Sequence, residues 1–166
     1  MDYSESAPAA FAEVAMNVTL WIMQGLWGVF FALNGFGKVL CYNQARWNQA
    51  LHSQPFMLFG VKFVPWFSGV SQGLFVFIGV CEFLGGVGVI LPAITRIKPK
   101  LTPFAAIGLA LFMLFAAVFH IVRGEYVFLP INLLLGVGAT FIAYGRLSMR
   151  PIASGRRPSA LETQTL

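Results

Sequence analysis

Five polar side chains lie within or beside long uncharged stretches of this 166-residue chain and could carry chemistry: Asn34, Lys38, Glu82, His120 and Asn132. In an apolar environment a charged side chain is costly unless it is paired or hydrated, so an ionisable residue there is a candidate site by default. Asn34 and Lys38 are four residues apart and share one face of a helix. Lys38, His120 and Asn132 are expected at similar depths on three helices. Asn34 and Glu82 are expected deeper.

These residues allow two interpretations. In the first, Lys38 pairs with Glu82, and the amides and the histidine complete a structural network that holds the helices together. In the second, the residues line a pocket open to the outer leaflet, where His120 and Glu82 handle a proton or hold the head of a lipid-soluble ligand. A lipid or another lipid-soluble molecule is the expected ligand class.

The sequence carries no fingerprint of an intrinsic cofactor or metal site. Motifs that bind flavin, nicotinamide or iron–sulfur clusters are missing, and a single histidine within a span disfavours bis-histidine haem. Cys41 and Cys81 are far apart and form no CxxC pair, so neither a zinc site nor a disulfide framework is expected. The chain is therefore expected to have no intrinsic cofactor, and any electron transfer would need a bound partner.

The composition is that of a membrane protein. Apolar residues make up 58% of the chain and charged residues 10%, whereas soluble domains have about 45–50% and about 25%. The net charge of +5 is distributed in short clusters between uncharged runs. Such clusters form no continuous basic stripe, so nucleic acid is excluded as a partner.

The uncharged runs predict an all-α membrane protein with a four-transmembrane-helix antiparallel bundle, since a membrane-spanning helix needs about 20 apolar residues. Short connections between the later spans make neighbouring helices antiparallel. The longer connection after the first span, with Trp47 and Trp66 as anchors, is expected to be an interfacial first loop. The expected spans are about 18–40, 67–93, 101–122 and 126–144, within a membrane domain 17–146 that separates a polar tail 1–16 from a basic tail 147–166.

The residues around Glu82 predict which way its side chain faces in the membrane. Gly79, Glu82 and Gly86 recur at positions i, i+3 and i+7 of the second span. A face of small residues lets another helix approach closely. Glu82 is therefore expected to face protein and not lipid.

The distribution of Lys and Arg predicts the topology. Seven of the eleven fall in the loop after the second span and in the C-terminal tail, and four fall on the other side of the membrane. Because Lys and Arg favour the cytoplasmic side, both termini are expected to be cytoplasmic.

Four segments, in this order, resemble the DoxX-like family of small four-helix membrane proteins. They are LWIMQGLWGVFFALNGFGKVL, FIGVCEFLGGVGVILPAITRI, LTPFAAIGLALFMLFAAVFHIVRGE and the Asn132 helix that ends in AYGR, which together cover about residues 20–146. The recurring polar residues of the family match Lys38, Glu82, His120 and Asn132. The resemblance implies a four-helix bundle in the bacterial inner membrane.

The resemblance also implies a connection with redox work, because similar proteins include small subunits of thiosulfate:quinone oxidoreductase. The expected function is an accessory subunit docked to a larger, electron-transfer membrane complex. The alternative is a quinone-reactive small subunit with an outer-leaflet polar pocket. A third is a membrane-protein assembly factor, since distant eukaryotic relatives act as chaperones or cargo receptors. The expected partners are membrane lipids and a larger complex that contacts the helix faces, the first loop and the tails.

Overall fold

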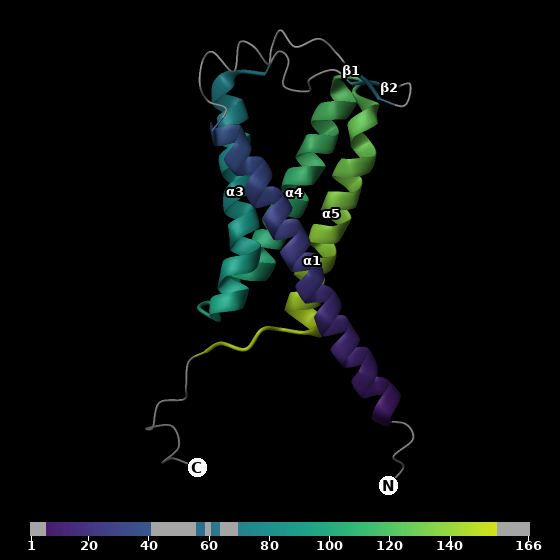
Figure 1. Cartoon of the computed structure of the whole chain (residues 1–166), viewed down its shortest axis with the longest axis vertical. Helices are drawn as coiled ribbons and strands as arrows, with labels where there is room; N and C mark the ends of the chain where they lie inside the picture. The colour runs from purple at the N-terminus through teal and green to yellow at the C-terminus, as the bar shows by residue number, and fades with distance from the viewer. Residues whose placement is uncertain (1–5, 41–55, 59–60, 64–69, 156–166) are drawn as a thin grey trace.

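The computed structural model describes residues 6–40, 56–58, 61–63 and 70–155, and these residues form a four-helix bundle (Figure 1). Each of the four helical segments is long and apolar enough to cross a membrane. The predicted all-α membrane fold is therefore confirmed. The helices are α1 (Ser6–Leu40), α3 (Gln72–Thr95), α4 (Leu101–Val122) and α5 (Leu129–Tyr144).

Shorter elements flank these helices. A 3₁₀ turn, η1 (Tyr126–Phe128), leads into α5, and a π-helical turn, η2 (Gly145–Met149), continues it. Within the predicted interfacial loop, β1 (Phe56–Leu58) pairs antiparallel with β2 (Val61–Phe63). The predicted anchors Trp47 and Trp66 lie outside the described residues.

Two helix starts differ from the predicted ends of the spans. Helix α1 begins at Ser6 and so includes most of the predicted polar tail 1–16, because several alanines in this stretch favour helix. Helix α3 begins at Gln72 and not near residue 67, because Ser71 is its N-cap. The Ser71 hydroxyl accepts a hydrogen bond from the Leu74 backbone N–H at 3.3 Å.

Buried apolar side chains such as Phe31, Leu109 and Ile142 form the centre of the bundle, while many other large apolar side chains point outward. Trp27 on α1 donates a hydrogen bond from Nε1 to the Leu135 carbonyl oxygen on α5 at 2.8 Å. Phe104 is 61% exposed and Leu133 69% exposed. Outward faces of this kind suit contact with lipid chains.

Glycines bring α1 and α3 into backbone contact. A Cβ atom placed on Gly86 would lie 2.5 Å from the Gly28 carbonyl oxygen, and one on Gly35 would overlap the Gly79 carbonyl oxygen. Only glycine permits this approach at these positions. The predicted small-residue face around Glu82 is confirmed, and Glu82 is only 7% exposed.

The described ends of the chain lie at the same end of the bundle, opposite the end of α1 at Leu40 and the start of α3 at Gln72 (Figure 1). With the Lys and Arg count, this arrangement predicts cytoplasmic location of both termini. Reporter fusions at Met1 and Leu166 should both give cytoplasmic signal, such as fluorescence of a protein that folds only in the cytoplasm. A periplasmic signal from either fusion would contradict the prediction.

Candidate functional site

Lys38 and Glu82 form an ion pair between α1 and α3. The Lys38 Nζ atom donates a hydrogen bond to Glu82 Oε2, and the two side chains are 16% and 9% exposed. Gly79 makes room for this pair, because a Cβ atom at Gly79 would lie 2.7 Å from the Lys38 Cβ. The pair predicted by the structural interpretation is thus present.

Asn34 is separate from this buried contact. Its side chain is exposed, and its Nδ2 atom donates to the Phe30 carbonyl oxygen of its own helix at 2.9 Å. Asn34 and Lys38 line an open groove of about 350 Å³ together with Leu33, Gly37 and Phe75. This groove connects the Lys38 side chain to the surface of the bundle.

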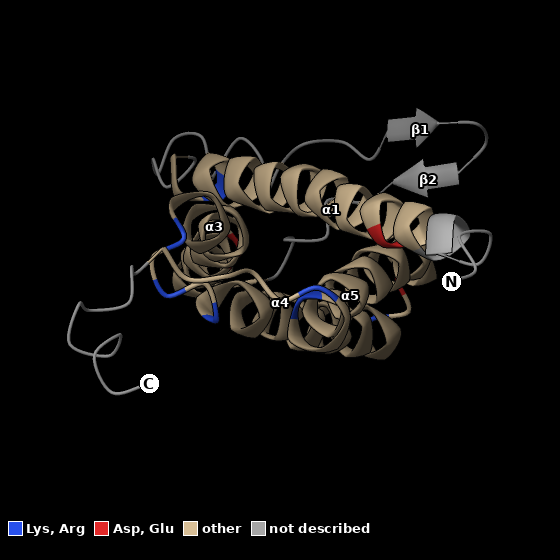
Figure 2. Cartoon of the chain, turned by 90° about the horizontal axis from the view of Figure 1, so that it is seen from below, with Lys and Arg blue, Asp and Glu red and all other residues tan. Residues whose placement is uncertain are grey.

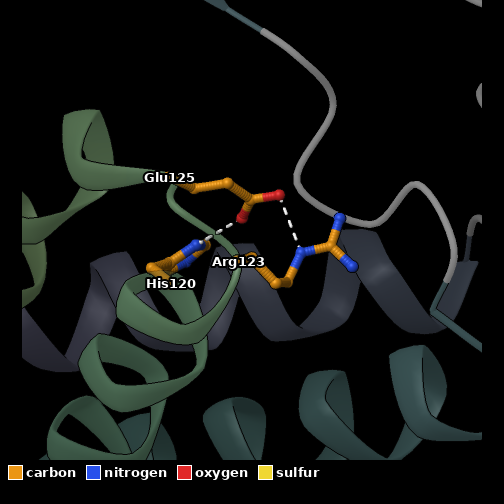
Figure 3. Close-up of polar contacts among 3 residues, drawn as sticks. All are labelled: His120, Arg123 and Glu125. Carbon is orange, nitrogen blue, oxygen red and sulfur yellow. Dashed lines mark hydrogen bonds and ion pairs between the residues drawn. The ribbon is translucent and has the colours of Figure 1, made fainter.

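His120 belongs to a second ionic group, at the end of α4 (Figure 3). Its Nδ1 atom lies 2.8 Å from Glu125 Oε2, and Arg123 Nε donates to Glu125 Oε1 at 2.7 Å. The ring of Phe128 stacks on the imidazole, with the ring centroids 4.8 Å apart. His120 is 6% exposed, so the group holds a buried imidazole against a carboxylate.

The turn after α4 builds this group. Gly124 has a φ of +70°, a left-handed conformation that favours glycine. The turn brings the Glu125 backbone N–H to the His120 carbonyl oxygen at 2.9 Å, so the glutamate side chain returns over the histidine. The H-x-x-R-G-E spacing therefore encodes the group.

The two ionic groups occur on different helix pairs. Lys38 and Glu82 join α1 to α3, whereas His120 and Glu125 lie where α4 leads into α5. Figure 1 shows the two helix pairs diverging toward the end of the bundle that carries these residues. The sequence predicts similar depths for Lys38, His120 and Asn132, and the structure places Lys38 and His120 in two separate ionic groups.

Asn132 lines a third feature, an apolar groove of about 870 Å³ between α4 and α5. The residue is 8% exposed, and its Nδ2 atom has no hydrogen-bond partner in the part of the chain that the structure describes. A buried amide donor without an acceptor is costly. The groove is therefore an apolar wall that includes one residue with a buried, unpartnered donor. Its other lining residues include Leu111, Leu114, Tyr126, Leu129, Leu133 and Thr140.

Sequence reasoning missed a buried arginine at the opposite end of the bundle. Arg146 was counted only as a topology charge, yet it is 4% exposed. Its Nε atom donates to Gln24 Oε1, and its Nη1 atom donates to Asn17 Oδ1 at 2.9 Å. The signal in the sequence was Gln24, a polar residue in the middle of an uncharged span, for which Arg146 is a partner.

Glu125, which contacts His120, and Arg123, which pairs with Glu125, are also absent from the predicted site. The residues of 6–40 and 70–155 contain no group of three His, Cys, Asp or Glu side chains that could hold a metal ion.

Comparison with known proteins gives one match. The sequence model of the DoxX-like family matches residues 22–142, which is well over half of the chain. No curated protein and no solved structure matches the chain. The matched region includes Lys38, Glu82, His120 and Asn132.

Proposed function

Because the chain belongs to the DoxX-like family, we propose that it is an accessory subunit of a membrane oxidoreductase and that it holds a quinone-type ligand in the groove between α4 and α5. The observation that carries this proposal is the buried, unpartnered Nδ2 atom of Asn132 in an apolar wall. A quinone carbonyl is an acceptor for that donor, and its ring and tail are apolar. The chain is a DoxX-like integral membrane protein.

The shape of the groove suits a ligand that has a polar head and a long apolar tail. Asn132 lies in the first turn of α5, near the end of the bundle opposite the described chain ends. The lining continues along both helices to Ile107 and Ala143. A quinone ring bonded to Asn132 would direct its tail along this apolar wall. Ligand sites of about 300–1,000 Å³ with few polar groups are typical of small-molecule binding.

The accessory role rests on the chemistry that the chain itself supplies. The groove can bind and orient a quinone through one hydrogen bond, and the His120–Glu125 pair can hold a proton at the same end of the bundle. Electron donation is assigned to a partner subunit. The outward apolar faces provide area for that partner within the inner membrane.

Replacing Asn132 by leucine is expected to weaken quinone binding about five- to tenfold, because leucine keeps the volume and removes the hydrogen-bond donor. The measurement is photolabelling of the purified full chain in nanodiscs with an azido-quinone, with decylubiquinone as competitor. Labelled peptides are expected from α4 and α5. Mild-detergent purification from native membranes should recover a flavin- or haem-containing partner with both the wild type and the variant.

Asn34→Leu is the matched control, because Asn34 is an exposed amide that bonds its own helix. Its affinity for the quinone should equal that of the wild type. Equal affinity of the Asn132→Leu variant, or labelling outside α4 and α5, would contradict the ligand proposal. Isolation of a lone monomer from native membranes would contradict the accessory role.

A further inference from the structure

A basic pocket of about 1120 Å³ opens at the end of the bundle that carries the described chain ends. Its walls are the loop between α3 and α4, the start of α4, and the segment after η2. The Gly155 backbone N–H donates to the Arg96 carbonyl oxygen at 3.2 Å and so closes the C-terminal segment against the loop. This pocket shares no lining residue with the Asn132 groove.

Four cations line this pocket, and no acidic residue does. Arg96, Lys98 and Lys100 are exposed residues of the loop. Arg146 lines the pocket from η2. Figure 2, seen from this end, shows basic segments around the loop after α3 and at the end of α5. Clustered cations without nearby carboxylates attract an anion.

Arg146 is the strongest sign of a ligand. Its hydrogen bonds go to neutral acceptors, the side-chain oxygens of Gln24 and Asn17 and the Arg150 carbonyl oxygen. Its Nη2 atom has no hydrogen-bond partner among the described residues, although the side chain is only 4% exposed. Within the described chain, no ion pair neutralises this guanidinium. The guanidinium lies 4.9 Å from the centroid of the Trp21 ring, a contact that offsets part of the cost of burying the charge, and an accompanying anion would offset more.

The remaining walls are apolar and indicate an amphiphile. Leu101 and Phe104 are 50% and 61% exposed and stand beside the basic loop. Leu147 and Ile152 complete the apolar lining. An acyl chain would cover these side chains while a phosphate remains near the cations. A guanidinium suits a phosphate because its planar fork matches two phosphate oxygens.

We propose that the basic pocket between the α3–α4 loop and the C-terminal segment is a binding site for the phosphate headgroup of an anionic membrane lipid. Arg96, Lys98 and Lys100 attract the phosphate, Arg146 supplies a buried positive charge beneath it, and Phe104 and Leu147 contact the acyl chains. Because anionic lipids also attract basic residues at the cytoplasmic surface, the site agrees with the predicted topology.

The test is native mass spectrometry of the purified full chain with phosphatidylglycerol and with phosphatidylcholine of identical acyl chains. Phosphatidylglycerol is expected to bind about tenfold more tightly or better, since each basic residue near an anionic lipid contributes measurably. The triple variant Arg96→Gln, Lys98→Gln, Lys100→Gln should lose this preference. Its changes are in exposed side chains, so folding should be retained, which circular dichroism checks.

Arg150→Gln is the matched control. Arg150 lies at the same end and its side chain pairs with Glu13 at 2.9 Å, but it does not line the pocket. Its lipid preference should be that of the wild type. Arg146→Lys keeps the buried charge and removes the second guanidinium donor, and it should reduce the preference only in part.

Two results would overturn the proposal. Equal binding of the two lipids by the wild type would exclude a site for anionic lipid, because zwitterionic phosphatidylcholine carries the same phosphate without a net negative charge. Binding of glycerol 3-phosphate as tight as that of phosphatidylglycerol would assign the pocket to a free phosphate compound and not to a lipid. Neither result would bear on quinone binding, because the Asn132 groove is a separate site.

Discussion

Lys38→Met is expected to lower the free energy of unfolding by about 3 kcal/mol or more, which is the usual cost of breaking a buried ion pair. The substitution leaves the Glu82 carboxylate, 9% exposed, without the Nζ atom that donates to it. An unpaired carboxylate within a membrane span must either take up a proton or draw in water. The measurement is unfolding of the purified chain in mixed micelles with increasing SDS.

A double-mutant cycle measures the coupling free energy between Lys38 and Glu82, apart from the effect of removing each side chain alone. Adding Glu82→Gln to Lys38→Met should restore part of the lost stability, because the neutral amide no longer needs a cation. Simple additivity of the two losses would show that Lys38 and Glu82 are not coupled. Lys100→Met is the control, since Lys100 is exposed on a loop and its removal should change stability by less than about 0.5 kcal/mol.

The helices and the direction of Glu82 could be predicted because both follow from local spacing. Uncharged length locates a span, and glycines at i−3 and i+4 of Glu82 show which side a neighbouring helix approaches. Helix starts were less predictable. Ser71 caps α3, so this helix starts at Gln72 and not near residue 67. Alanines extend α1 back to Ser6.

The lateral arrangement of the candidate residues could not be predicted in the same way. Counting residues along a helix gives the depth of His120, but it does not show that His120 lies apart from the pair of Lys38 and Glu82. Glu125 follows Gly124 in a turn, so its contact with His120 depends on a left-handed backbone conformation. The sequence places Arg146 among the charges of the C-terminal tail, because its burial depends on η2 continuing α5.

Gly35→Ala is expected to disrupt the contact between α1 and α3 and to cost about 3 kcal/mol or more, at or above the upper end for overpacking. The added Cβ would overlap the Gly79 carbonyl oxygen and the backbone of Phe83. Both are backbone atoms of a helix, so no side-chain rotation can relieve the overlap. Gly86→Ala should behave alike, because its Cβ would lie 2.5 Å from the Gly28 carbonyl oxygen.

Gly37→Ala supplies the matched comparison, two residues further along the same helix. A Cβ at Gly37 meets nothing within 4 Å, and alanine favours helix over glycine by about 0.5–1 kcal/mol. The Gly37 variant should therefore unfold at the same or slightly higher SDS than the wild type, while the Gly35 variant unfolds at much lower SDS. Equal stability of the two variants would show that α1 and α3 do not pack through their backbones. Because Lys38 reaches Glu82 across this contact, separation of the helices should also abolish the coupling between Lys38 and Glu82.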